Sequence, residues 1–262
     1  LESNPSIKAL GLSATPRENK ILPTIYKMEM DVAKEGGFVS QLTIAGVPVS
    51  LNELEQDSYN KLSNVISSNL QQGGGWSQVM SGIDPFTQSY SNRQISRKYA
   101  LLRATVQRKL LMSKILSKFE KLCELCERYK DEPIMVFSES IDAIEMAREY
   151  LKARGIEAHT YHSGKGTDDR SEILRFWGHS FNVLLSVRCL DEGIDIPEVA
   201  VGIVMASGRS EKQLIQRTGR LIRPYKGKSM AKMYVIYGKD TNEKNIPEKL
   251  TSLTNAKYVE VN

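Results

Sequence analysis

From Pro133 onward the sequence alternates between short apolar runs and longer amphipathic stretches. Short apolar runs bounded by turn residues are typical of buried strands, and apolar residues recurring every three or four positions are typical of helices. The predicted strands are 133–138, 157–162, 182–187, 199–205 and 230–237, and the predicted helices are 140–153, 167–177 and 210–222. Apolar strands that alternate with helices predict an α/β fold with a parallel sheet covered by helices on both faces. Ligands of such sheets bind at the carboxyl ends of the strands.

The region before Pro133 follows a different pattern. Residues 38–51 alternate well enough to predict a strand, in which Pro48 indicates an edge position or a bulge because proline cannot donate to the ladder. Asn52 and Glu55 have the spacing of a capping box, and apolar residues at i+4 spacing continue the helix that it begins. This part of the chain therefore contributes one strand and a helical region.

Residues 71–90 are rich in glycine, serine and glutamine, which predicts a flexible loop. Within it, we interpret Trp76 as a local packing anchor or as part of a disordered segment, with stacking on a nucleic-acid base as the alternative. A long helix is predicted from Ser91 to about Tyr129. Between Ser91 and Lys118 lie eight basic residues and no acidic one: Arg93, Arg97, Lys98, Arg103, Arg108, Lys109, Lys114 and Lys118. This uniform sign leaves two interpretations, a solvated helix face and contact with phosphates.

Composition narrows the class of protein. The formal net charge of +5 is mildly basic and fits contact with nucleic acid without requiring it. No apolar run is long enough to span a bilayer and the start has no signal-peptide pattern, so we expect no membrane and an intracellular location, cytoplasmic or in the nucleoid or nucleus.

Cys123 and Cys126 form a Cys-x-x-Cys pair, but no other cysteine or histidine has paired spacing. Core packing is therefore favoured over a metal site, and none is predicted.

Residues 210–224 carry the most informative helix. Ser210 begins it as an N-cap, and Pro224 ends it. Gln216, Arg220 and Arg223 fall on one narrow face, opposite an apolar face. Two guanidinium groups one turn apart suit a polyphosphate, which each can grip through two hydrogen bonds. The alternative is an ordinary solvated basic face.

A second motif follows the predicted strand 182–187. The loop after this strand carries Gly193 and Asp195. Gly193 permits a close approach of the backbone to a ligand. The carboxylate of Asp195 can accept hydrogen bonds from a ribose hydroxyl or from a nearby arginine.

Three segments resemble conserved motifs of superfamily 2 helicases. Motifs III, V and VI are similar, in the right order, to residues 13–15, 193–197 and 216–223. The resemblance covers residues 6–16 and 133–237. The 190–193 run and the Gln-Arg-x-Gly-Arg-x-x-Arg-Pro form look most like xeroderma-pigmentosum-B-like DNA helicases. Gln216 and Ile222 stand where DEAD-box RNA helicases usually carry His and Gly, which argues against that branch.

The resemblance implies a role for each motif. Arg220 and Arg223 would be arginine fingers that meet the γ-phosphate of ATP, and Gln216 would assist them. Gly193 and Asp195 would contact the nucleotide. Coupling of hydrolysis to strand movement is implied for Ser13, Ala14 and Thr15. Contact with the backbone of the tracked strand is implied for Ser138, Ser163, Ser186 and Arg188.

The sequence contains no P-loop, which requires Gly-x-x-x-x-Gly-Lys-Ser/Thr after a strand. The resemblance therefore implies a second RecA-like domain, with ATP and Mg²⁺ bound mainly by an absent first RecA-like domain and no ATP hydrolysis by this chain alone. The expected organisation is a terminal strand with motif III at 1–20, a connecting strand and basic, thumb-like helical insertion at 21–130, the second RecA-like domain at 131–240 and a tail at 241–262.

These inferences predict the C-terminal motor half of an ATP-dependent DNA helicase or translocase. The expected partners are DNA, as a single strand or duplex junction, the missing N-terminal RecA-like domain, and repair proteins. One alternative is the motor half of a restriction-type translocase or RNA-dependent ATPase. Another is a nucleic-acid-binding module without motor activity.

Overall fold

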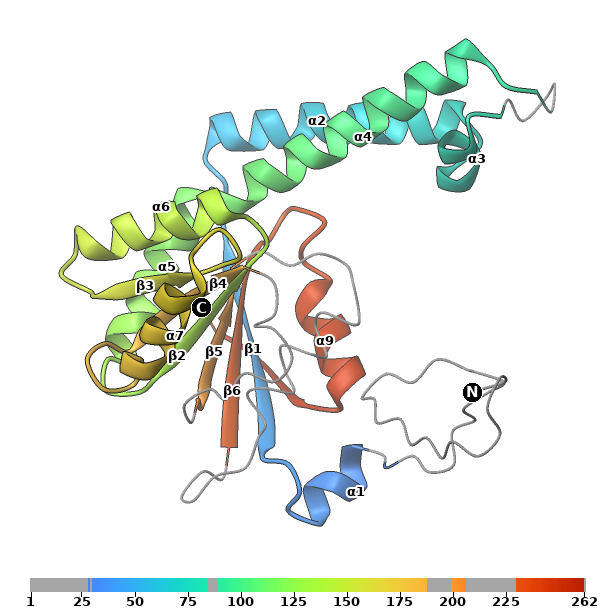
Figure 1. Ribbon diagram of the computed structural model, residues 1–262. Coiled ribbons are helices and arrows are strands. Elements are labelled where there is room, and N and C mark those ends of the chain that lie inside the picture. The colour runs from blue at the N-terminus through green and yellow to red at the C-terminus, as the bar shows by residue number, and fades with distance from the viewer. Residues whose placement is uncertain (1–27, 29, 84–88, 188–198, 206–229, 262) are drawn as a thin grey trace, which may run out of the picture.

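A parallel sheet of seven strands forms the centre of the protein (Figure 1). The computed structural model describes residues 28, 30–83, 89–187, 199–205 and 230–261. The strands are β1 Gln41–Val49, β2 Ile134–Ser138, β3 Ala158–Tyr161, β4 Val183–Val187, β5 Val201–Val204, β6 Met230–Gly238 and β7 Lys257–Glu260. Their order is β3-β4-β2-β5-β6-β1-β7, and all neighbouring strands pair in parallel. The carboxyl ends of the strands therefore share one edge of the sheet, which we call the carboxyl edge.

Helices cover both faces of this sheet. The described helices are α1 Met30–Glu35, α2 Glu53–Gln72, α3 Trp76–Ser81, α4 Asn92–Ser113, α5 Leu116–Arg128, α6 Ile141–Lys152, α7 Thr167–Phe176 and α9 Ile246–Thr254, of which α5, α6, α7 and α9 pack on the sheet. Strand β2 shows how the two faces are filled. Ile134 and Val136 belong to the core that includes α5 and α6, whereas Met135 and Phe137 belong to the core that includes α7 and α9. This alternation is the period of two expected of a strand, and the predicted parallel sheet with two covered faces is confirmed.

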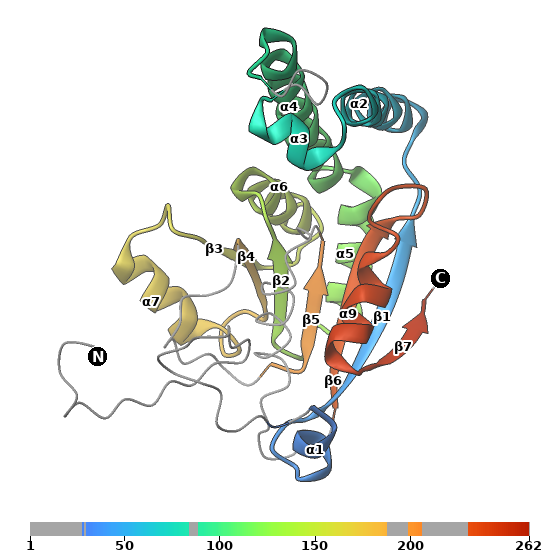
Figure 2. The same ribbon diagram turned by 90° about the vertical axis from the view of Figure 1, so that its right-hand side faces the viewer.

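Helices α2, α3 and α4 form a helical arm that extends beyond the carboxyl edge (Figures 1 and 2). Strand β1 leads into the arm through the predicted capping box. Asn52 Oδ1 accepts from the Glu55 backbone N–H at 2.9 Å, and the Glu55 carboxylate accepts from the Asn52 N–H at 2.9 Å. The arm has a small core of its own, formed by Ile66, Val79, Leu101 and Ala104.

The predicted flexible loop at 71–90 contains helix α3, which is a correction to the sequence prediction. Val79 of α3 is fully buried in the arm core. Gln94 of α4 is also fully buried, and its Nε2 donates to the Gly73 carbonyl oxygen at 2.9 Å. Packing against α4 therefore stabilises a helix that the glycine- and serine-rich sequence does not favour.

The single helix predicted from Ser91 to about Tyr129 is two helices, α4 and α5. Ile115 separates them in an extended conformation, with φ −65° and ψ 127°. Its side chain is fully buried in a cluster with Tyr59 and Met112. Burial of this one side chain at the base of the arm fixes the break.

Strand β1 is not at an edge of the sheet, contrary to one of the two interpretations of Pro48. It lies between β6 and β7. Strand β7 pairs with residues 43–46 of β1. Pro48 lies beyond these pairs, so its lack of a backbone N–H costs no hydrogen bond to β7.

The Cys-x-x-Cys pair lies in the main core, as predicted. Cys123 and Cys126 of α5 are 4% and 1% exposed and belong to the core on the α5–α6 face of the sheet. Burial raises the pKa of the Cys126 thiol, so the group stays protonated and packs as a small apolar side chain.

Candidate nucleotide and nucleic-acid interface

Three of the predicted contact residues lie near the carboxyl edge, on neighbouring strands. Ser138 ends β2 and pairs in register with Val187 of β4, while Ser186 of β4 is level with Tyr161 of β3. Ser163 follows β3 by two residues and is exposed. Ser138 and Ser186 are 1% and 0% exposed. The fold thus brings the three serines to adjacent strand ends, with only the Ser163 side chain open to solvent.

A polar network holds the loop that begins at Ser163. Glu145 of α6 accepts a hydrogen bond from Thr160 Oγ1 at 2.7 Å and lies 3.3 Å from His162 Nε2. His162 Nδ1 accepts from the Gly164 N–H at 3.1 Å, so the ring hydrogen is on Nε2 and faces Glu145. Burial acts to raise the pKa of Glu145, but the hydrogen bond from Thr160 and other nearby donors and cations outweigh it and lower the pKa. Glu145 is therefore an anion that fixes the start of the loop.

Nine predicted site residues lie outside the described residues: Ser13, Ala14, Thr15, Arg188, Gly193, Asp195, Gln216, Arg220 and Arg223. Two of the segments that carry these residues begin at the carboxyl edge of the sheet. Val187 ends β4, before the segment that carries Gly193, and Met205 follows β5, before the segment that carries Arg220. Strands β4 and β5 are the two neighbours of β2, so both segments begin beside the end of the central strand.

A buried ion pair lies directly against the end of β5. Lys118 of α5 is completely buried, and its Nζ donates to Glu243 Oε2 at 2.6 Å and to the Met205 carbonyl oxygen at 2.9 Å. Glu243 also accepts from the Gly238 N–H at 3.1 Å. The pair thus joins α5, the end of β5 and the loop after β6. The pair was not predicted from the sequence, although the position of Lys118 between the apolar residues Ile115 and Leu122 was an available signal.

Most of the basic residues between 91 and 118 have partners within the protein. Arg97 bonds Gln72 and Gln94, Arg108 bonds Ser63, Lys109 pairs with Glu139, Lys114 pairs with Asp142, and Lys118 pairs with Glu243. No described residue forms an ion pair or hydrogen bond with Arg93, Lys98 or Arg103 of α4. These three cations are the ones that the described structure leaves available for a phosphate backbone.

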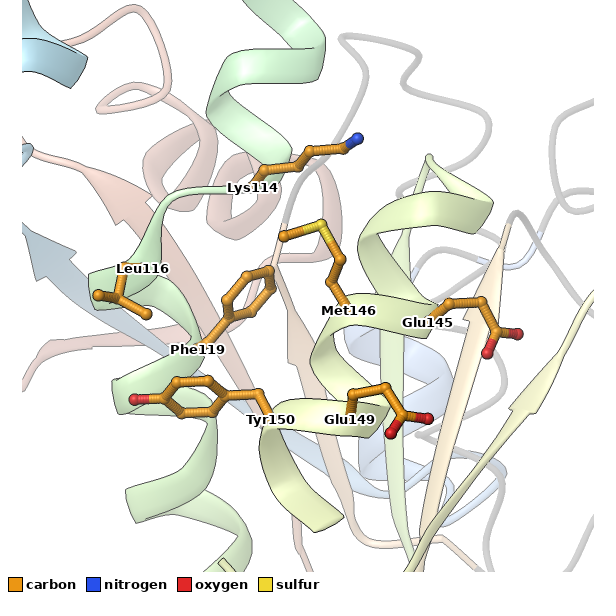
Figure 3. A pocket seen from close by; sticks show the side chains of 7 residues that line it. All are labelled: Lys114, Leu116, Phe119, Glu145, Met146, Glu149 and Tyr150. Atoms are coloured by element: carbon orange, nitrogen blue, oxygen red, sulfur yellow. The ribbon is translucent and has the colours of Figure 1, made fainter. Parts of the chain in front are cut away.

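A pocket of about 590 Å³ lies between α5 and α6 (Figure 3). Its lining residues are Lys114, Leu116, Phe119, Glu145, Met146, Glu149 and Tyr150. Figure 3 shows the side chains of Leu116, Phe119, Met146 and Tyr150 gathered together, with the carboxylates of Glu145 and Glu149 turned away from them. This lining suits a hydrocarbon group and not a triphosphate, which needs several converging cations or N–H donors.

Two classes of feature are absent from the part of the chain that the structure describes. It contains no cluster of three or more histidine, cysteine or acidic side chains able to hold a metal ion. None of its helices is both long and apolar enough to cross a membrane.

Comparisons with known proteins find a matching domain and several similar proteins. Residues 117–225 match the helicase conserved C-terminal domain. The chain is 28% identical over 224 residues to the DNA 3'-5' translocase XPB2 of Sulfurisphaera tokodaii, an alignment that covers 82% of this chain and 49% of that protein. It is 33% identical over 107 residues to the UvrABC system protein B of Francisella tularensis, covering 38% of this chain and 16% of that one. The chain thus spans at most about half the length of these relatives.

Solved structures share the fold. The helicase domain of Pyrococcus furiosus Hef superposes with a TM-score of 0.59 and 16% identity, over 83% of this chain and 58% of that one. The C-terminal domain of the Sulfolobus solfataricus SWI2/SNF2 ATPase superposes with a TM-score of 0.54 and 15% identity, over 80% of this chain and 86% of that one. Residues 117–225 are therefore similar to a helicase C-terminal domain, and the parallel sheet with its helices has the fold of RecA-like helicase C-terminal domains.

Proposed function

We propose that this chain is the C-terminal motor half of an ATP-dependent DNA helicase or translocase. The observation that carries the proposal is the sequence spacing of Gln216, Arg220 and Arg223, which predicts one shared helix face and falls inside the matched helicase domain. The segment that carries this face follows β5, whose end lies at the carboxyl edge where α/β sheets bind their ligands.

In this proposal ATP and Mg²⁺ are bound mainly by a first RecA-like domain that carries a P-loop. ATP supplies the free energy for movement. Arg220 and Arg223 meet the developing negative charge on the γ-phosphate, and Gln216 assists at the same cleft. Gly193 and Asp195 contact the nucleotide, and residues 13–15 couple its state to the tracked strand. The Lys118–Glu243 pair supports this geometry because it fixes Met205, the last described residue before the arginine segment.

The tracked nucleic acid lies against two surfaces. Ser163 and Arg188 contact its backbone at the carboxyl edge, together with the backbone near Ser138 and Ser186. Phosphates also contact Arg93, Lys98 and Arg103 of the arm, for which the described structure contains no internal partner. The name of the XPB2 relative states that it translocates on DNA, which favours DNA as the substrate.

The test is ATP hydrolysis by a polypeptide that joins this chain to a P-loop-bearing RecA-like domain. We expect no hydrolysis by the chain alone and DNA-stimulated hydrolysis by the joined protein. Arg220→Ala in the joined protein is expected to lower kcat by about 10³-fold or more. Arg175→Ala is the matched control, because Arg175 is an exposed arginine of α7 with no proposed role.

The result also separates the alternatives. Stimulation by single-stranded DNA, duplex DNA and RNA is compared in the joined protein, and stimulation by RNA alone would point to an RNA-dependent ATPase. If the joined protein shows no ATPase, and Arg220→Ala changes only nucleic-acid binding, the chain is a binding module and the motor proposal is wrong.

A further inference from the structure

Helix α4 has a second apolar face that is partly exposed to solvent. Five large apolar side chains on it are between 37% and 70% exposed: Ile95, Tyr99, Leu102, Val106 and Leu110. We call this set the α4 stripe. The helix contacts α2 and α3 through a different set of residues, which includes the buried Leu101 and Ala104.

The spacing of the α4 stripe defines its shape. Successive members are separated by four, three, four and four residues, so at about 100° per residue they all fall within a sector of roughly 80°. From Ile95 to Leu110 the stripe runs about 22 Å along the helix. Scattered apolar residues on a surface are ordinary, but a straight row over four turns has the form of a helix-packing seam.

The composition of the α4 stripe favours a protein partner over nucleic acid. Four of its five members are aliphatic, and only Tyr99 has a ring that could stack on a base. Bases bind to aromatic platforms, whereas rows of aliphatic side chains at i, i+4, i+7 and i+11 bind the apolar face of another helix.

The charges beside the stripe indicate the charge of the partner helix. Helix α4 has six basic residues and no acidic one. Lys98 and Lys109 lie along one border of the stripe and Arg103 lies along the other. Two copies of this face would place like charges opposite each other, which disfavours a homodimer. An acidic helix would pair with Lys98 and Arg103 on these borders, where it would compete with the phosphates of the proposed function, whereas Lys109 already pairs with Glu139.

We propose that the α4 stripe is a docking surface for an amphipathic helix of a partner protein, with an apolar face about four turns long and acidic side chains flanking it. Such a surface lies on the arm and is separate from the ATP cleft of the proposed function. Binding there would connect the arm to a second protein without blocking the carboxyl edge.

The experiment measures binding of a designed, fluorescently labelled amphipathic peptide to the 262-residue chain by anisotropy. The probe has leucines at the seam positions and glutamates at the flanking positions, and a second probe has lysines at the flanks. We expect the glutamate probe to bind at least tenfold more tightly than the lysine probe. We also expect Leu102→Gln with Val106→Gln to weaken binding of the glutamate probe by about tenfold or more.

Gln107→Glu is the matched control, since Gln107 is exposed on α4 but lies outside the stripe. It is expected to change binding less than threefold. Thermal unfolding of the double variant checks that an effect is not loss of folding, because both replaced side chains are exposed. Three results would each overturn the proposal: equal binding of the two probes, no effect of the double variant, or a stripe-dependent dimer of the chain in sedimentation without the probe.

Discussion

At the scale of single residues, the Lys118–Glu243 pair shows how charge is used inside this domain. Two ions inside a protein lose their hydration, and their attraction offsets that loss only with good geometry and further hydrogen bonds. Here Lys118 also donates to Met205 and Glu243 also accepts from Gly238, so both ions have a second partner. The pair therefore holds three segments in one arrangement, which matters more than its net contribution to stability.

Removal of one member of this pair is expected to be severe. Lys118→Met leaves the carboxylate of Glu243 buried without its cation, and we expect the free energy of unfolding to fall by about 3–5 kcal/mol. Urea unfolding followed by circular dichroism measures it. Lys121→Met is the control, because its pair with Glu124 is partly exposed and contributes at most about 1 kcal/mol. Equal midpoints and slopes for the two variants would show that the buried pair is not needed for stability.

At the scale of elements, periodic segments were predictable from the sequence and packing-dependent ones were not. Strand β4, at 183–187, was predicted at 182–187 because four of its five residues are apolar, as is typical of a strand covered on both faces. Helix α3 was missed because its stability comes from Val79 and from Gln94, which is fifteen residues further along the chain. The ion-pair partners of the basic residues could not be predicted from the sequence either, because Lys109 pairs with a glutamate thirty positions away. In contrast, the parallel order of the predicted strands was enough to predict that Ser138, Ser163 and Ser186 lie near one edge of the sheet.

Helix α3 also gives a test of the two interpretations of Trp76. The chain has two tryptophans, and Trp76 is 50% exposed whereas Trp177 is 0% exposed. If Trp76 stacks on bases, a single-stranded oligodeoxythymidine will quench the accessible part of the emission. Trp76→Phe is then expected to remove the quenching, and Trp76→Ala to weaken binding by about tenfold, since one stacked base contributes roughly 1–3 kcal/mol. Quenching that survives in Trp76→Phe would assign Trp76 to local packing.

At the scale of the whole molecule, the arm and the sheet are connected at the carboxyl edge. Tyr59 of α2 accepts from the Asn242 backbone N–H at 2.7 Å and its hydroxyl lies 3.2 Å from the Asn242 side-chain oxygen. Lys109 and Lys114 pair with Glu139 and Asp142, which follow β2. These contacts place the arm over the edge at which the nucleic acid is proposed to lie. The two ion pairs also use Lys109 and Lys114, which the sequence alone could have assigned to phosphate contacts.

Only the three unengaged cations of α4 should therefore contribute to phosphate binding by the arm. Each phosphate contact adds about 0.9 to the slope of log K against log salt for duplex DNA. Replacement of Arg93, Lys98 and Arg103 by alanine is expected to lower that slope by up to about 3 and to weaken binding at low salt. The slope is measured by titrating duplex DNA at several salt concentrations.

The control for this experiment removes the same net charge from the opposite edge of the sheet. Lys130, Lys152 and Lys257 are exposed and lie near the amino ends of β2, β3 and β7. Their triple alanine variant has the same formal charge as the arm variant, so a general electrostatic attraction would affect both slopes equally. A change confined to the arm variant locates the phosphates along α4. Equal changes would mean that the arm is a solvated basic face and that DNA is held by the sheet edge alone.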